Sequence, residues 1–266
     1  METESAEILR KLRLQIAEMV FRSGEGHIPS SYSVVDIIYA TYKFFEQDLG
    51  NESTSGRFVL SKGHAAASLY AVLVQFGIMD QYLLDEYGIS GGRLGGHPDR
   101  NKQKGVEANT GSLGHGLAYC VGLAMAGQIL GKREFYVCLV GDGECQEGST
   151  WEAASIAANN RLRNMIVVVD WNKSASQLQP IENLKEKWES FGFQVIQASG
   201  HDVEEMLGAF NFALSNSERV DHPWVIIAET IKGKGVDFIE GHGKWHHRIP
   251  SLEEMNEIRV QLSGKK

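Results

Sequence analysis

The chain has 266 residues, of which 42% are hydrophobic and 23% are charged, and its formal net charge at pH 7 is -8. This length and composition are typical of a globular protein with one large hydrophobic core, so we expect a single domain over residues 1–266. The negative charge argues against nucleic acid or an anionic membrane surface as the main partner, because both would repel the chain.

Three further features indicate a cytoplasmic protein. Cys120, Cys138 and Cys145 form neither a C-x-x-C pair nor a disulfide framework, which is typical of a reducing compartment. The first residues, METESAEILRKLRLQIAEM, are charged throughout and lack the apolar core of a secretory signal. The most apolar stretch, residues 113–130, contains His115, Gln128 and several glycines, so it is typical of a buried or interface helix rather than a membrane span.

The first third of the chain has a helical pattern. Apolar residues recur at steps of three and four over residues 5–22, which predicts an amphipathic helix. A second helix is predicted from Val34 to Phe45. A third is predicted within residues 61–77 and ends at Gly77.

The rest of the chain alternates between strands and helices. Two short segments rich in β-branched residues, at 135–140 and 165–170, predict buried strands. Two further strands are predicted at 193–198 and 224–229. Helices are predicted at 148–162, around 203–214, and after about 250, where a basic tail follows. This alternation predicts an α/β fold, a doubly wound parallel sheet with helices on both faces.

Polar residues follow two of these strands, at the edge where such sheets bind their ligands. Asp142 lies in a Gly-Asp-Gly turn after the first strand, and Asn172 follows the second. Each fragment alone is more often a turn or a helix cap, but together they provide hard oxygen ligands that suit Mg²⁺. The glycines and the next helix N-terminus favour an adjacent diphosphate, so the pair predicts a metal and diphosphate site.

Beyond this pair, the chain resembles the diphosphate-binding domain of transketolases, which are thiamine diphosphate enzymes. The resemblance extends from the first helix to Ile249. The matching segments occur in the family's order and approximate spacing, and they are SGEGHIPSS, RFVLSKGHAA, GGHPD, TGSLGHGLA, GDGECQEGSTWEAA, DWN, FGFQVIQASGHDVEEM, ETIKGKG and KWHH.

The resemblance implies thiamine diphosphate and Mg²⁺ as cofactors, with Ca²⁺ or Mn²⁺ able to replace Mg²⁺. It implies metal ligation by Asp142, Asn172 and the carbonyl of Ser174. The implied cofactor contacts are Ser30, His64, Gly111, Ser112, Leu113, Gly143, Asn172, Lys232 and His246. The implied catalytic residues are His27, His97, His246 and Glu147, the last in a proton network near a subunit interface.

Histidine suits these roles because it exchanges protons near neutral pH. Lys62 and Lys232 add the positive charge that an acidic protein needs to bind an anion. We expect structural rather than catalytic roles for four other histidines, His201, His222, His242 and His247, and also for Cys145.

The resemblance also implies a partner. Full-length transketolases carry a second domain, whose glutamate contacts the cofactor's pyrimidine ring, and this chain has no room for it. We therefore expect a separate subunit with that glutamate, an α₂β₂ assembly, no activity from this chain alone, and transfer of a two-carbon ketol unit from a ketose phosphate to an aldose.

Four local departures from the family pattern leave the sugars open. They are the short loop KSASQLQPIENL, the segment GHIPSS, His115 in place of a frequent glutamine, and His247 in place of a usual glycine. A specialised two-carbon transferase that acts on an unusual sugar or an α-keto acid, in secondary or surface-sugar metabolism, is therefore an alternative.

Three other classes of protein are less well supported by the sequence. A nicotinamide nucleotide-binding protein is disfavoured because neither GSLGHG nor GDGECQ gives G-x-G-x-x-G at a strand-to-helix turn. A non-catalytic regulatory remnant need not keep metal and proton-transfer residues together. A zinc hydrolase lacks an H-E-x-x-H helix.

Overall fold

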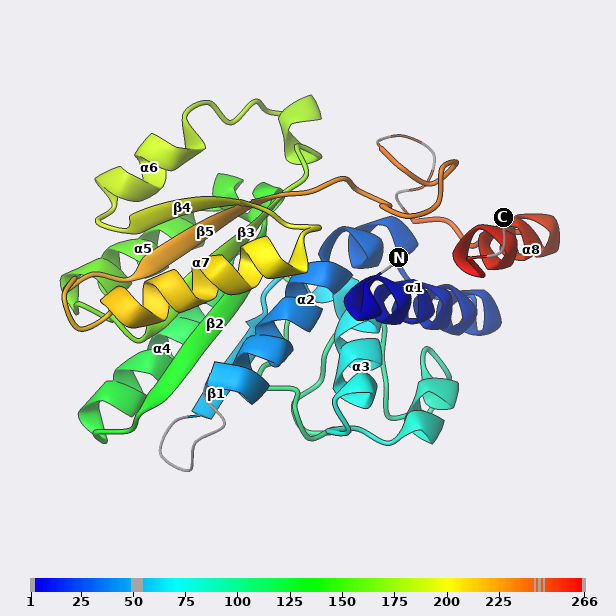
Figure 1. Ribbon diagram of the computed structural model, residues 1–266, viewed down its shortest axis with the longest axis horizontal. Coiled ribbons are helices and arrows are strands. Elements are labelled where there is room, and N and C mark those ends of the chain that lie inside the picture. Colours follow the sequence, from blue (N-terminus) through cyan, green and yellow to red (C-terminus); the bar gives the residue numbers. More distant parts are fainter. Residues whose placement is uncertain (1–2, 49–54, 242, 244, 246, 265–266) are drawn as a thin grey trace.

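The computed structural model describes residues 3–48, 55–241, 243, 245 and 247–264. A five-stranded parallel sheet lies at its centre (Figure 1). In spatial order the strands are β1 (Ser55–Leu60), β2 (Glu134–Gly141), β3 (Met165–Trp171), β5 (Trp224–Glu229) and β4 (Gln194–Ser199). The α/β fold predicted from the sequence, with a doubly wound parallel sheet, is confirmed.

Helices cover both faces of the sheet. They are α1 (Glu4–Ser23), α2 (Ile28–Asp48), α3 (Ala66–Gln75), α4 (Gly116–Ile129), α5 (Gly148–Asn159), α6 (Leu184–Ser190), α7 (Val203–Asn216) and α8 (Leu252–Leu262). In Figure 1, α2 and α7 cross in front of the sheet and α4 and α5 lie behind it, while α1, α3 and α8 extend the front layer away from the strands.

The alternating side chains of the strands divide the hydrophobic core into two layers. Val137 and Leu139 of β2 belong to the layer that includes α1, α2, α3, α7 and α8. Cys138 and Val140 of the same strand belong to the layer under α4, α5 and α6. Because both faces are buried, the central strands have continuous apolar runs, such as Met165 to Val169 of β3, rather than alternating apolar and polar residues.

Three element boundaries differ from the sequence prediction. Helix α2 begins at Ile28, six residues before Val34, and its polar first turns are buried because Ser30 and Ser33 face other side chains rather than water. The helix predicted over 148–162 ends at Asn159. The segment before residue 61 is an edge strand, β1, which the sequence suggested only as a short apolar run.

The C-terminal helix packs on the N-terminal one. Ser251 and Glu254 form a capping box at the start of α8, which fixes where the helix begins. Arg259 of α8 donates to both carboxylate oxygens of Glu18 in α1, at 2.7 and 3.0 Å. In the part of the chain that the structure describes, no helix combines the length and the apolar character needed to cross a membrane.

The register between β2 and β3 brings the residues that follow these two strands to the same edge of the sheet. Gly141, the last residue of β2, is paired with Asp170 of β3. Asp142 directly follows Gly141, and Asn172 directly follows Trp171, the last residue of β3. Both side chains therefore leave the sheet at the same edge, as a right-handed strand–helix–strand connection requires.

Candidate active site

A cavity of about 210 Å³ lies at the carboxyl ends of β2 and β3. It brings together segments that are far apart in the sequence, from the first turn of α2 to the loop after β5. Its lining consists of Ser30, Lys62, His64, Leu113, Gly141, Asp142, Gly143, Glu144, Asn172, Ser174, Ala175, Leu178 and Lys232. Most residues that the sequence assigned to the metal and the cofactor diphosphate therefore share one cavity.

Of the three expected metal ligands, the two that use side-chain oxygens, Asp142 and Asn172, are buried and held by backbone amides. Asp142 accepts from the N–H of Gly143 at 2.8 Å and from the N–H of Ala175 at 2.9 Å. Asn172 Oδ1 accepts from the N–H of Ser174 at 2.9 Å. Each of these side-chain oxygens keeps a further lone pair, so the bonds orient the oxygens and leave them able to bind a cation.

Asp170, which the sequence analysis did not assign to the site, orients Asn172. The Asn172 amide nitrogen donates to Asp170 Oδ2 at 2.8 Å and to Ser33 Oγ at 3.1 Å. Asp170 is fully buried, and it also accepts from Ser33 Oγ at 2.8 Å, from Thr230 Oγ1 and from the Lys62 ammonium. Because the amide nitrogen is committed to these acceptors, the amide oxygen is the end left for a cation. The sequence feature that could have identified Asp170 is the presence of an acidic residue at the end of a buried strand.

Two lysines supply positive charge to the cavity. Lys62 forms a buried ion pair with Asp170, and Lys232 donates to Ser174 Oγ at 2.8 Å. Burial, and after it the neighbouring Lys62 ammonium, lower the pKa of Lys232. Burial also raises the pKa of Asp142, so both charges sit where water solvates them poorly. A bound ion of opposite charge would therefore stabilise the charged form of each group.

Glu144 is a second residue that the sequence did not single out. It is buried, and it accepts from Ser61 Oγ at 2.5 Å and from the N–H groups of Gly114 and Gly141 at 2.9 Å. It therefore ties the loops after β1 and before α4 to the end of β2. Burial raises the pKa of Glu144 although these donors oppose the shift.

The histidine side chains form a cluster at the cavity. The ring centroid of His27 lies 5.4 Å from that of His64, 6.5 Å from that of His97 and 4.4 Å from that of His247. His247, for which a structural role is expected, thus has its ring against a predicted catalytic residue. Burial, followed by the Lys62 ammonium, lowers the pKa of His64 to about 2, so His64 is a neutral hydrogen-bonding group.

The remaining predicted residues lie around this cluster. A Cβ at Gly111 would stand 2.8 Å from the His97 ring, so the loop containing Gly111 packs directly on that histidine. Ser112 follows this loop and is exposed. Glu147 is exposed at the start of α5, beside Gly114, and outside the cavity lining. His246 lies outside the described residues.

His201 and Cys145, for which structural roles are expected, lie outside the lining of the first cavity, and His242 lies outside the described residues. His201 bonds to Asp36 and to the backbone of Ile231. Cys145 is buried, and burial raises the pKa of its thiol, which makes it a poor nucleophile.

The donor set suits a hard divalent cation bound together with phosphate. Among the described residues, no group of three or more histidine, cysteine, aspartate or glutamate side chains could hold a metal alone. One carboxylate, one amide oxygen and a backbone carbonyl are instead the incomplete oxygen set that Mg²⁺ uses when substrate phosphates and water complete its shell. The fold and the cavity thus define an α/β protein with a candidate site at the carboxyl ends of its strands, whose side chains suit a phosphate group and a hard cation.

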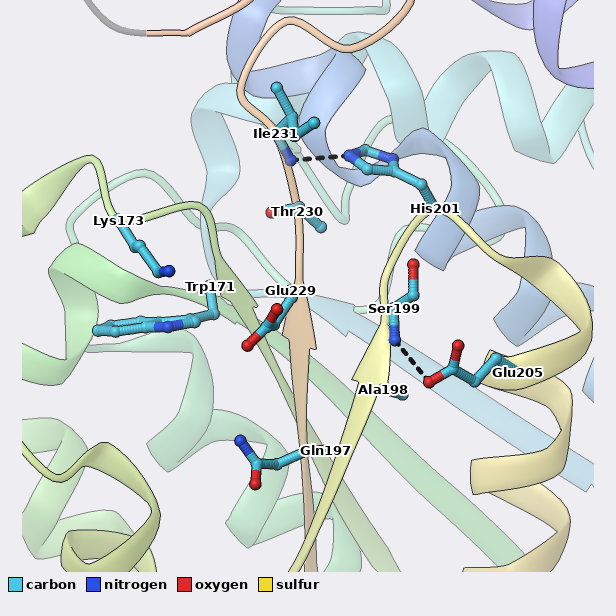
Figure 2. A pocket seen from close by; sticks show the side chains of 10 residues that line it. All are labelled: Trp171, Lys173, Gln197, Ala198, Ser199, His201, Glu205, Glu229, Thr230 and Ile231. Carbon is cyan, nitrogen blue, oxygen red and sulfur yellow. Dashed lines mark hydrogen bonds between the residues drawn. The ribbon is translucent and has the colours of Figure 1, made fainter.

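A second, larger cavity of about 570 Å³ lies beside the first, at the carboxyl ends of β3, β4 and β5 (Figure 2). In this view Trp171 and Lys173 lie on one side and His201 on the other, with Glu229 and Ile231 on β5 and the following loop between them. The loop after β5 separates the two cavities, since it carries both Ile231 and Lys232.

Comparisons with known proteins define the family. The model of the family "Transketolase, thiamine diphosphate binding domain" matches residues 3–265. The chain therefore belongs to the transketolase family through its thiamine diphosphate-binding domain, and the resemblance inferred from the sequence is confirmed. Its class is that of thiamine diphosphate-dependent transferases.

Among relatives, one of the subunits of the apulose-4-phosphate transketolase of Phocaeicola vulgatus is 34% identical over 276 residues, which cover 100% of this chain and 96% of the relative. The subunit of the same name from Actinobacillus succinogenes is 38% identical over 249 residues, 90% of this chain and 88% of the relative. Human transketolase is 35% identical over 96% of this chain, but only 42% of the human protein is covered.

Solved structures agree with this pattern. The transketolase of Leishmania mexicana superimposes with a TM-score of 0.86 at 27% identity, over 100% of this chain and 42% of that chain. The Campylobacter jejuni enzyme gives a TM-score of 0.80 at 29% identity, over 99% and 43%. The chain thus spans less than half of these transketolases, whereas it spans nearly all of the two relatives that are named as transketolase subunits.

Proposed function

We propose that this chain is the N-terminal, cofactor-binding subunit of a two-chain transketolase, which transfers a two-carbon ketol unit from a ketose phosphate to an aldose. The coverage of its relatives supports this proposal most directly. The chain covers 96% of a relative that is named as one subunit of a transketolase, but only 42% of human transketolase. The remaining part of the active site would then belong to a separate subunit that carries the glutamate facing the cofactor's pyrimidine ring.

The first cavity is the proposed cofactor site. Asp142, Asn172 and the Ser174 carbonyl would hold Mg²⁺, with Ca²⁺ or Mn²⁺ as substitutes. Lys232, His64, Gly143 and Ser30 would contact the diphosphate end of thiamine diphosphate. Gly111, Ser112 and Leu113 would contact the cofactor from the side of α4, and His246 is proposed by sequence alone.

When bound, thiamine diphosphate supplies the electron sink that allows a carbon–carbon bond beside a ketone to break. This chain's residues would orient the substrate and move protons at its oxygens. His27 and His97 would exchange protons with the sugar hydroxyls. His64, whose pKa is lowered by burial, would donate or accept a hydrogen bond without changing charge. Glu147 is proposed to act near a subunit interface.

Helix α4 and its surroundings support an assembly of several chains. The sequence of α4, GLAYCVGLAMAGQI, contains no charged residue. Large apolar side chains nevertheless remain exposed on and next to α4 and on α5, namely Leu113, Ile129, Leu130 and Ile156. Exposed apolar surface of this kind is typical of protein interfaces. We propose that this face contacts a second copy of the chain, as an α₂β₂ assembly requires, in the cytoplasm.

The substrate is proposed at the level of a sugar phosphate. Relatives named for apulose-4-phosphate and for 6-deoxy-6-sulfo-D-fructose favour a specialised sugar as the second candidate. His247 supports this candidate, because a fourth imidazole beside His27 adds a polar contact for a substrate hydroxyl or anion.

Calorimetric titration of thiamine diphosphate with Mg²⁺ tests the proposal. It should be done with the chain alone and with a candidate C-terminal-half transketolase subunit. We expect metal-dependent binding that tightens with the partner, because part of the cofactor's contacts lie there. The Asp142→Ala variant should lose this binding. Binding that depends on neither Mg²⁺ nor Asp142 would contradict the proposed site. The absence of binding both with and without the partner subunit would also contradict it.

A further inference from the structure

The loop after β5 is held by hydrogen bonds on both sides of Lys232. The N–H of Ile231 donates to His201 Nε2 at 2.8 Å. The N–H of Gly233 donates to the carbonyl of Pro29 at 3.0 Å, and the carbonyl of Lys234 accepts from Arg13 Nε at 2.7 Å. The backbone around Lys232 is thus fixed by three partners from other parts of the chain.

Two of these partners converge on one buried carboxylate, Asp36 of α2. Asp36 Oδ2 lies 2.5 Å from Arg13 Nη2 and 2.5 Å from His201 Nδ1. The side chains of Asp36 and Arg13 are 2% and 7% exposed, so this ion pair is shielded from water. Although burial opposes ionisation, Arg13 and His201 together lower the pKa of Asp36, and it is a carboxylate at neutral pH.

This carboxylate also selects the tautomer of His201. An imidazole nitrogen that accepts from a backbone N–H carries no hydrogen, so Nε2 is the acceptor and Nδ1 carries the hydrogen. Nδ1–H then donates to Asp36, as in the carboxylate–histidine pairs that orient metal ligands. Figure 2 shows His201 reaching across the rim of the second cavity to the Ile231 amide.

We propose that Asp36, through Arg13 and His201, positions Lys232 for the cofactor diphosphate. The inference rests on the proposed function, in which Lys232 contacts that diphosphate. Helix α2 carries Ser30 and Asp36, so one buried carboxylate fixes the position of the Lys232 loop relative to the cavity wall opposite it. Asp36, Arg13 and His201 are positioning residues, since none of them lines the first cavity.

Substitutions at Asp36 and His201 separate positioning from general stability. Asp36→Asn presents an amide N–H₂ to His201, which favours the other tautomer and places an Nε2–H against the Ile231 N–H. His201→Phe removes the acceptor altogether. His201→Gln retains a side-chain oxygen that can accept from Ile231. Glu134→Gln is the matched control, because it breaks a pair with Arg57 at the amino end of β2, far from both cavities.

Two measurements in the full chain are expected to agree. Amide exchange of residues 230–236, followed without cofactor, should be about fivefold faster in Asp36→Asn and His201→Phe, and near normal in His201→Gln and Glu134→Gln. The Kd for thiamine diphosphate with Mg²⁺, measured with the partner subunit present, should rise about tenfold in the first two variants only. The kcat at saturating cofactor should stay within about twofold.

The outcomes are distinguishable. If the unsubstituted protein binds thiamine diphosphate and Asp36→Asn and His201→Phe bind it equally well, the inference is overturned and the proposed function stands. If Asp36→Asn fails to fold, the contrast between His201→Phe and His201→Gln decides. An equal loss of cofactor affinity in His201→Phe and His201→Gln would overturn the inference. A near-normal affinity in His201→Gln alone would support it. An unsubstituted protein that binds no cofactor overturns both proposals.

Discussion

His64 is a histidine whose acid–base behaviour differs strongly from its behaviour in water. Burial and the nearby Lys62 ammonium lower its pKa from 6.5 to about 2. Below pH 6.5 the unfolded chain binds a proton at this histidine and the folded chain does not, so this contribution to stability is present above that pH and lost as pH falls. We expect about 1 kcal/mol of stability to be lost per pH unit below 6.5 from this group.

Urea unfolding of the cofactor-free chain between pH 7 and pH 5 measures this slope. His64→Gln cannot titrate and should show a shallower slope than the unsubstituted chain. His222→Gln is the control, because His222 is exposed and its loss should leave the slope unchanged. An identical slope in His64→Gln would mean that the histidine is charged in the folded protein.

Asp170 provides a second test at the same scale. It holds the Asn172 amide and the Lys62 ammonium without lining the cavity itself. In Asp170→Asn the carboxylate is lost, so Asn172 is free to turn its amide nitrogen toward the metal position. We expect Mg²⁺-dependent binding of thiamine diphosphate to weaken at least about tenfold, as measured by calorimetry.

The control for this substitution is Asp221→Asn, which breaks an exposed pair with Arg161 and should have almost no effect on binding or stability. Unchanged Mg²⁺ dependence in folded Asp170→Asn would show that Asn172 is oriented by its other contacts.

Helix α4 shows how close packing constrains a whole element. A Cβ at Gly116 would lie 2.5 Å from the Cα of Ser61, whereas a Cβ at Gly122 of the same helix would meet nothing within 4 Å. Gly116→Ala must push α4 away from the loop after β1, which carries Ser61 and Lys62. We expect it to destabilise the chain by about 1–3 kcal/mol, and Gly122→Ala to stabilise it by about 0.5–1 kcal/mol.

Thermal unfolding of the two variants side by side checks this contrast. Equal melting temperatures would mean that the first turn of α4 can shift at no cost. In that case the site would tolerate movement between α4 and β1.

Elements with a strong period or a continuous apolar run were predictable. The helix over 5–22 and the four strands from 135 onward were found because burial of one or both faces leaves a direct pattern in the sequence. The start of α2 was placed too late because its first turns are rich in serine, and their burial depends on distant residues such as Asp170. Helix α6, seven residues long, and the edge strand β1 are too short for a clear pattern.

At the scale of the whole molecule, the prediction concerns assembly. If the α4 face contacts a second copy, Ala126→Arg should introduce a charge into that contact and lower the mass measured by light scattering toward that of one chain, or of one chain with its partner subunit. Gly208→Arg, at an exposed position of α7, is the matched control and should leave the mass unchanged. A chain that is monomeric before substitution, with or without its partner, would contradict the α₂β₂ assembly.

The sequence by itself determined the fold class, the family and the membership of Asp142 and Asn172 in one site. It could do so because buried parallel strands are continuously apolar and because ligand residues follow their carboxyl ends. Only the tertiary structure decided which groups hold that site in place. Asp170, Glu144, Asp36 and His201 make contacts with residues far away in the sequence, from 23 positions between Arg13 and Asp36 to 165 positions between Asp36 and His201. Such contacts have no period or spacing in the sequence, since they exist only once the sheet and its helices bring distant loops together.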